Sequence, residues 1–236
     1  STRLMESGQQ SDGLYYILST VKKIFYIALL LLEILVWRDW NRREIVHPPG
    51  VLVPEAPRQG KLAEPVSFEF KGYQLTRRAA FDIRARVLSR EDYRWGAATD
   101  LSPMDLALGW GVMSDQAVLD RIEISQRSRW YFTKYDLPAP IPDPAIISHS
   151  SNVHMVPAND WVLSKLRDIR HGDVIRARGF LIDVDHESGF RWRTSLSRND
   201  TGNGSCELFY IEQIEIEPKI CAWKNSVETG SGHGAI

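Results

Sequence analysis

The stretch from Ile24 to Trp37 (IFYIALLLLEILVW) constrains this chain most, because all of its fourteen residues except Glu33 are apolar. A helix needs about 20 apolar residues to cross the hydrocarbon core of a bilayer, so the flanks of this shorter run decide its role. Ammonium groups reach up to lipid headgroups, and indole rings concentrate at the same level. The flanking residues of these kinds are Lys22, Lys23, Trp37 and Trp40. The sequence therefore predicts a single membrane-anchor helix within residues 14–43.

Two alternatives compete with this anchor. A cleaved signal peptide would end in small residues, whereas WRDWNRRE follows the apolar core. A buried helix of a soluble protein stays open, because Leu14 to Val21 can extend one amphipathic helix. Glu33 lies one turn before Trp37, where it is solvated at the interface or contacts a partner helix. We expect an uncleaved anchor with the C-terminal domain on the periplasmic side.

Composition divides the rest of the chain. Residues 1–13 form a polar N-terminal tail, and residues 44–65 contain five prolines, which disfavour helix and favour an extended stalk. An extramembrane domain is expected over residues 66–224. The last segment, residues 225–236, is rich in Gly and Ser and is expected to be a flexible tail.

Within the domain, apolar and polar residues alternate from Phe81 to Val87, as in a half-buried strand. Short helices are expected after Ser102, Ser114 and Asn159, each of which can cap a helix. Further strands are expected over residues 66–75, 122–132, 174–184, 190–196 and 206–216. The predicted fold class is α+β, with an anchor helix followed by a mainly antiparallel sheet, possibly a small barrel.

The charge balance argues against a general polyanion binder. The formal net charge is -1 and 43% of the residues are hydrophobic, which indicates a folded body with no implied nucleic-acid partner. Cys206 and Cys221 are the two cysteines, and their spacing leaves a disulfide open.

A catalytic site is imaginable from Cys206 with His154 or His149, since a thiolate nucleophile needs a histidine within hydrogen-bond reach. Spacing alone does not show that reach, and a cysteine at the start of a strand is more often a small buried residue. The triplet Asp200-Thr201-Gly202 occurs in aspartic proteases, but the apolar strand that should precede it and a second aspartate are missing. The sequence predicts no cofactor and no metal site.

Four stretches carry a resemblance to a family. They are ARVLSREDY (Ala85 to Tyr93), LSPMDLALGWGVMSD (Leu101 to Asp115), SNVHMVPA (Ser151 to Ala158) and SLSRNDTGNGSCE (Ser195 to Glu207). Together they resemble an uncharacterised family of bacterial membrane-anchored envelope proteins. The resemblance implies a location in the cell envelope, with no activity and no site residues attached to it.

These observations favour a membrane-anchored accessory or scaffold subunit of a larger membrane complex, whose partners are the lipid bilayer and integral membrane proteins. The alternative is a cell-envelope hydrolase that uses the Cys/His residues.

Overall fold

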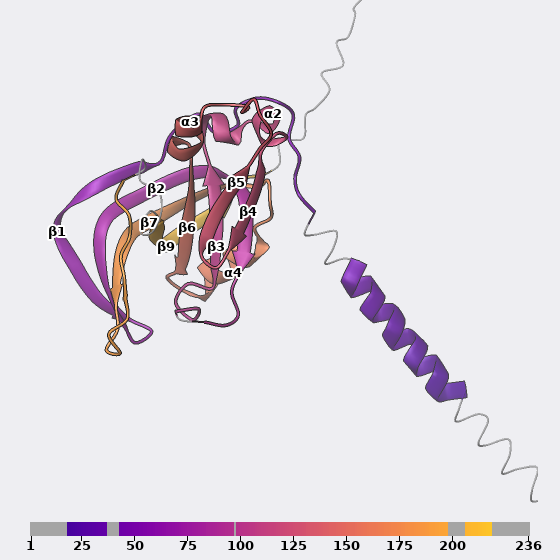
Figure 1. The fold of residues 1–236 in the computed structure, drawn as a ribbon. Coiled ribbons are helices and arrows are strands. Elements are labelled where there is room, and N and C mark those ends of the chain that lie inside the picture. The colour runs from indigo at the N-terminus through magenta and orange to yellow at the C-terminus, as the bar shows by residue number, and fades with distance from the viewer. Residues whose placement is uncertain (1–17, 37–42, 97, 198–205, 219–236) are drawn as a thin grey trace, which may run out of the picture.

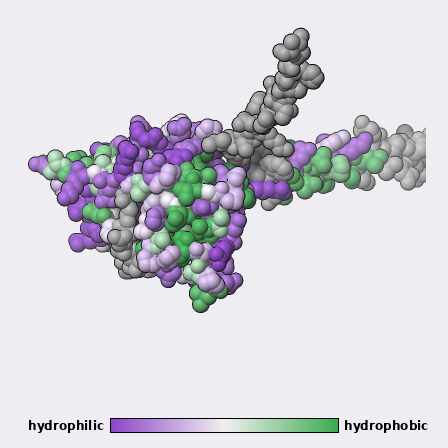
Figure 2. Space-filling view, turned by 90° about the horizontal axis from the view of Figure 1, so that it is seen from above, coloured by the Kyte–Doolittle hydropathy of each residue, from purple (hydrophilic) through white to green (hydrophobic). Residues whose placement is uncertain are grey.

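The computed structural model describes residues 18–36, 43–96, 98–197 and 206–218 (Figure 1). Its first element is a helix over residues 18–36, whose large apolar side chains are exposed and form much of its surface (Figure 2). Among the described residues, none of the helices has the length and apolar character that a membrane crossing requires. The helix over residues 18–36 carries the charges of Lys22, Lys23 and Glu33. The transmembrane part of the fold prediction has no support here. Trp37 and Trp40, also assigned to the anchor, lie outside the described residues.

The domain is built on long strands in one sheet. The main strands are β1 (Arg58–Phe70), β2 (Tyr73–Asp92), β3 (Met104–Gly109), β6 (Ser150–Pro157), β7 (Val174–Asp185) and β9 (Glu207–Ile216). A short β8 (Arg191–Trp192) pairs with the end of β7. All of these pairings are antiparallel except the parallel pair of β6 and β9. The predicted α+β fold with a mostly antiparallel sheet is confirmed.

Five of these strands close into a barrel. The order runs β2-β3-β6-β9-β7, and β7 pairs back onto β2. This closure is possible because β2 is 20 residues long: β1 and then β3 pair along one of its edges, while β7 pairs along the other. Numbered along the chain, the barrel strands have the order 1-2-3-5-4, with helix α4 (Asp160–Asp168) between the third and the fourth. This connectivity is that of the OB fold, a five-stranded Greek-key barrel.

Alternation along the strands creates the core. Phe81, Ile83, Ala85 and Val87 of β2 all point into the barrel, as the sequence pattern predicts. The interior also holds Leu106 of β3 and Phe209 of β9, as well as residues of β6 and β7. Phe209 meets Phe81 edge to face at 5.0 Å between ring centroids.

The structure corrects the helix predicted after Ser102. Residues Met104–Gly109 form strand β3, and all six are buried. Ser102 and Pro103 resemble a helix start locally, but a strand position between β2 and β6 hydrogen-bonds this segment on both edges. The other two helix predictions are confirmed. Asp115 accepts a hydrogen bond from Ala117 N at the start of α2 (Gln116–Leu119), and Asn159 accepts one from Val162 N at the start of α4.

The segment expected to be a stalk is partly built into the domain. Val53 is fully buried, its carbonyl accepts a hydrogen bond from Gly111 N at 2.7 Å, and its N–H donates to Ser114 Oγ at 3.0 Å. Residues 58–65 belong to β1, so the boundary expected at residue 66 falls inside a strand. Proline disfavours helix in this segment, but an extended chain can still pack and pair.

The segment that joins the N-terminal helix to the barrel, called the connector below, also contacts the domain nearer to its start. Ile45 N donates to His171 O at 2.9 Å, and the backbone of Ile45 packs against Gly172. Gly172 has φ +87°, and a Cβ added there would come 2.0 Å from the carbonyl oxygen of Ile45. Only glycine allows this close approach, so the docking of the connector at Ile45 depends on Gly172.

Candidate functional site

The outer face of β3 and β6 is the face on which OB barrels bind extended ligands. Here the insertion between these two strands covers it. The insertion comprises a 3-10 turn (Gly111–Ser114), α2, the hairpin β4 (Glu123–Arg127) and β5 (Trp130–Lys134), and α3 (Asp143–Ser148). Met113, Ile122 and Ile146 of the insertion form a second apolar cluster with Leu88 and Ala107 of the barrel. The face that this fold offers to a ligand is therefore occupied by the chain itself.

Polar contacts complete this cover over β6. Gln126 Nε2 donates to Asn152 Oδ1 at 2.6 Å, and Tyr131 OH donates to Ser150 Oγ at 3.1 Å. Burial raises the pKa of Tyr131 to about 12, so its hydroxyl keeps its proton.

A buried ionic cluster lies under the tip of the β4–β5 hairpin. Asp105 of β3 is fully buried, and Arg129 Nη1 donates to its Oδ1 at 2.7 Å. Tyr93 OH donates to Oδ2 at 3.1 Å, and His154 Nδ1 lies 2.8 Å from Oδ1. His154 faces Asp105 directly across the β3–β6 ladder, which explains this proximity. The Nδ1 atom nevertheless has no hydrogen-bond partner among the described residues, so its contact with Asp105 is a close approach only.

The hairpin turn that carries Arg129 is conformationally demanding. Ser128 and Arg129 both have positive φ, at +55° and +70°, which is typical of a two-residue type I′ hairpin turn. Neither is glycine, so the turn costs energy that surrounding contacts must offset. Arg129 N donates to Tyr93 OH at 2.9 Å, and the guanidinium lies 3.7 Å from the centroid of the Tyr93 ring. Arg129 also lies 5.3 Å from the ring centroid of Trp192, whose ring packs on His154 at 4.6 Å.

The contacts of this cluster hold the β4–β5 hairpin on the barrel. Burial, followed by the negative charge of Asp105, raises the pKa of Tyr93, so the phenol stays a hydrogen-bond donor. The Arg129 guanidinium compensates the charge of the Asp105 carboxylate inside the chain, and Tyr93 donates a hydrogen bond to it. A general base needs access to a substrate proton, which a fully buried carboxylate lacks.

The candidate residue His154 lies on β6, and Cys206 directly precedes β9, the strand beside it. By the parallel register of β6 and β9, Cys206 falls beside Asn152, on the side where His154 is two residues further along. Cys206 Sγ is 3.7 Å from Asn152 Nδ2 and 4.0 Å from Arg129 O. Neither of these groups removes a proton from a thiol, so these contacts favour a structural role for Cys206. Cys221 and Asp200-Thr201-Gly202 lie outside the described residues.

His149 is placed elsewhere. It precedes β6, and its Nδ1 is 2.9 Å from Ala145 O, while its ring packs against Gly111. Cys206 falls beside Asn152, which is three residues further along the chain than His149, a distance of about 10 Å in extended chain. The structure therefore does not bring His149 to Cys206. In the described ranges, no three His, Cys, Asp or Glu side chains are grouped as metal ligation requires.

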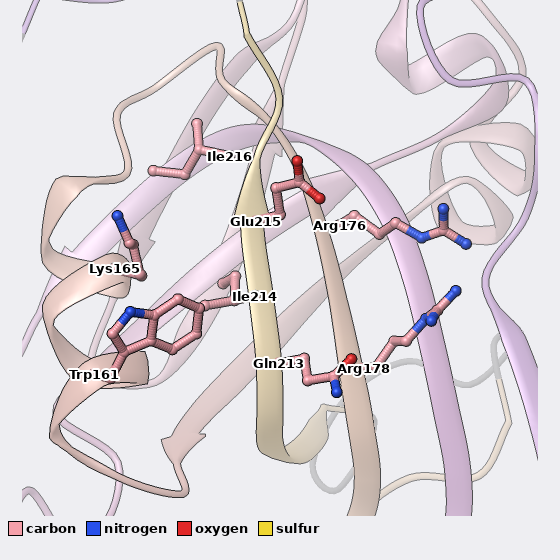
Figure 3. Close-up of a pocket in the computed structure, with 8 residues that line it drawn as sticks. All are labelled: Trp161, Lys165, Arg176, Arg178, Gln213, Ile214, Glu215 and Ile216. Carbon is pink, nitrogen blue, oxygen red and sulfur yellow. The ribbon is translucent and has the colours of Figure 1, made fainter.

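A groove of about 670 Å³ lies on a different face, along α4, β7 and β9 (Figure 3). Its lining residues are Trp161, Lys165, Arg176, Arg178, Gln213, Ile214, Glu215 and Ile216. Trp161 and Lys165 project from α4 on one side of β9, while Arg176 and Arg178 project from β7 on the other side. Trp161 is 56% exposed, and Lys165 Nζ lies 6.0 Å from its ring centroid.

Sequence reasoning missed this groove. Arg176 and Arg178 are visible as the polar positions of an alternating strand, but every half-buried strand has such positions. The one usable signal is a large aromatic residue, Trp161, two residues after the helix cap Asn159.

Comparison with protein families, curated proteins and solved structures finds no match to this chain. The resemblance to bacterial membrane-anchored envelope proteins therefore stays a prediction.

Proposed function

We propose that this protein is a membrane-associated accessory subunit that binds partner proteins through its N-terminal helix and its barrel domain, without chemistry of its own. The observation that carries the proposal is the helix over residues 18–36. Its exposed large apolar side chains are Leu18, Val21, Ile24, Phe25, Tyr26, Ile27, Leu29, Leu30, Leu31, Leu32, Ile34, Leu35 and Val36. Apart from Lys22, Lys23 and Glu33, most of the surface of this helix is apolar, and a large exposed apolar surface marks a site that lipid or protein covers.

The size of this exposed surface indicates that something covers it. Each of these side chains is at least 43% exposed. Full burial of one such side chain stabilises by about 1.5–3 kcal/mol, so covering the whole helix contributes on the order of 10 kcal/mol even if half of each is already buried. That is enough to offset the entropy lost on association.

The connector supports a scaffold more than a mobile tethered domain. The connector is docked on the barrel from Ile45 to Val53, so residues 37–44 separate the docked chain from the helix. Nine backbone steps span about 32 Å at most. The domain is thus held close to whatever the helix binds, which suits a subunit that contacts a neighbouring membrane protein.

The location and the partners follow as parts of the same proposal. Lys22 and Lys23 at one end of the apolar segment suit a headgroup layer, and Glu33 near the other end suits a polar contact with a partner helix. We place the helix in a bilayer beside integral membrane proteins, with the domain on the periplasmic side.

The experiment is a mild-detergent purification of the full-length chain from its native membrane, with mass spectrometry of stoichiometric companions. We expect the chain in the membrane fraction, with a constant set of integral membrane proteins. Leu31→Arg should release it from both. Val66→Arg is the matched control, because Val66 is an equally exposed apolar residue of the domain. A chain that stays in the supernatant without detergent and purifies alone would overturn the proposal.

A protease digest of intact spheroplasts tests the side of the membrane. Cleavage of the domain from outside is the expected result, and protection until lysis would place it in the cytoplasm.

A further inference from the structure

Strand β9 has an open edge beside α4. Its first half pairs with β6 up to Ile211, where Ala158 N donates to Ile211 O at 3.0 Å. The chain then turns away from the sheet into α4, which begins at Asp160. Beyond Ile211, β9 continues to Ile216 with β7 paired along one side, and no other strand among the described residues pairs along the side that faces α4.

The register shows which backbone groups face that open side. Glu217 N donates to Val174 O at 2.8 Å, so this pair is hydrogen-bonded in the antiparallel ladder. Hydrogen-bonded pairs recur at every second residue, so Gln213 and Glu215 also direct their N–H and C=O groups toward β7. Ile214 and Ile216 therefore direct theirs away from β7. In the described part of the chain, no hydrogen bond is recorded to the backbone groups of these two residues.

The groove of Figure 3 lies along this edge. Four consecutive residues of β9, from Gln213 to Ile216, line it. Arg176 and Arg178 of β7 line the groove on the other side of β9, so the groove extends over the face of β9 as well as along its edge. Trp161 and Lys165 of α4 form the opposite wall (Figure 3). Five residues of strand extend about 17 Å, and the volume of about 670 Å³ accommodates an extended segment of that length.

We propose that this edge of β9 accepts an extended, acidic segment of a partner protein as an added strand. Main-chain hydrogen bonds to Ile214 and Ile216 would supply affinity, as in other cases of strand addition. The inference rests on the proposed subunit function, which supplies the partner, and names how the domain contacts it.

The charge of the groove lining favours an acidic ligand. Three cations line the groove, Lys165, Arg176 and Arg178, against the single carboxylate of Glu215. Asp82, just outside the lining, pairs with Arg178 at 2.9 Å and with Arg176 at 3.7 Å, and the three cations still outnumber Glu215 and Asp82. Trp161 adds an exposed indole face for an apolar side chain that alternates with the acidic ones.

Amide hydrogen exchange on the full-length chain in detergent tests this proposal at single residues. The probe is the capped hexapeptide Glu-Val-Glu-Val-Glu-Val. Without the probe, the amides of Ile214 and Ile216 should exchange at least tenfold faster than that of Glu215, which bonds to β7. With the probe, the exchange of Ile214 and Ile216 should slow at least tenfold, while that of Glu215 stays unchanged.

Three controls separate the parts of the claim. The same peptide with alternate amides N-methylated keeps every side chain but cannot pair as a strand, so it should give no protection. The Lys-Val analogue tests the sign of the charge and should bind more weakly. Lys165→Glu should weaken binding of the acidic peptide about tenfold, whereas Lys134→Glu, at an exposed lysine of β5, should leave it unchanged.

Equal exchange of Ile214, Glu215 and Ile216 in the chain without peptide would overturn the inference, as would equal protection by the N-methylated peptide. These results would not change the interpretation of the membrane purification. Conversely, peptide binding by a chain that fails the membrane test would remove the proposed location while the strand-addition site stands.

Discussion

Arg129, at the tip of the β4–β5 hairpin, donates from Nη1 to Oδ1 of the fully buried Asp105 at 2.7 Å, 24 residues earlier in the chain. This contact fastens the insertion onto the barrel and closes the face on which OB barrels bind ligands. It also explains how a non-glycine residue is held at φ +70°.

Removing the cation should therefore be costly. We expect Arg129→Ala to lower the free energy of unfolding by about 3 kcal/mol, because it leaves the Asp105 carboxylate buried without its main partner. Urea denaturation measures the change. Lys134→Ala, which breaks the exposed pair with Glu123, is the control and should cost less than about 1 kcal/mol. Equal effects of the two variants would mean that the buried pair contributes nothing special.

The connector depends on Gly172. Gly172→Ala should weaken docking of the segment around Ile45, because the added Cβ would come 2.0 Å from the Ile45 carbonyl. We expect faster tryptic cleavage after Arg43 and a lower free energy of unfolding. Gly189→Ala is a matched control, since Gly189 has the same φ of +87° but nothing within 4 Å of the added Cβ. Both variants carry the cost of an alanine at positive φ, so the difference between them measures the contact of residue 172 with Ile45. Equal effects of the two variants would contradict the role assigned to this contact.

Stability should fall in acid through Glu217. Arg84 donates to both of its carboxylate oxygens, at 2.6 and 2.8 Å, and holds the pKa of Glu217 below the ordinary value of 4.5. A folded-state pKa below the unfolded one gives stability that is present above pH 4.5 and lost as the pH falls through the folded value. Melting temperatures of the wild type and Glu217→Gln between pH 3 and 7 test this. The variant should have a flatter profile, and parallel profiles would exclude this pair as a source of the acid sensitivity.

The reactivity of Cys206 decides the hydrolase alternative. Its thiol meets Asn152 Nδ2 and Arg129 O, which do not stabilise a thiolate as a protonated histidine does. In a Cys221→Ala background, we expect iodoacetamide to alkylate Cys206 at pH 6.5 more slowly in the folded chain than in the urea-unfolded chain. Faster alkylation in the folded state, abolished by His154→Ala, would revive a Cys/His site.

Several elements were readable from the sequence because their signals are local. The alternation from Phe81 to Val87, the Asn159 cap of α4 and the strand ending at Ile216 each depend on neighbours within a few residues. Residues 104–109 show the limit of such signals, since a good helix start became a buried strand once β2 and β6 paired on either side.

The sequence by itself determined the amphipathic strands, the capped helix α4 and an apolar segment that needs a cover. The tertiary structure alone decided that β7 closes the barrel on β2, that Asp105, Arg129 and His154 converge, and that β9 keeps an edge open beside α4. Periodicity and capping act over a few residues, whereas strand partners are chosen by burying whole faces across long stretches of chain. That choice depends on all strands together, so no single segment encodes it.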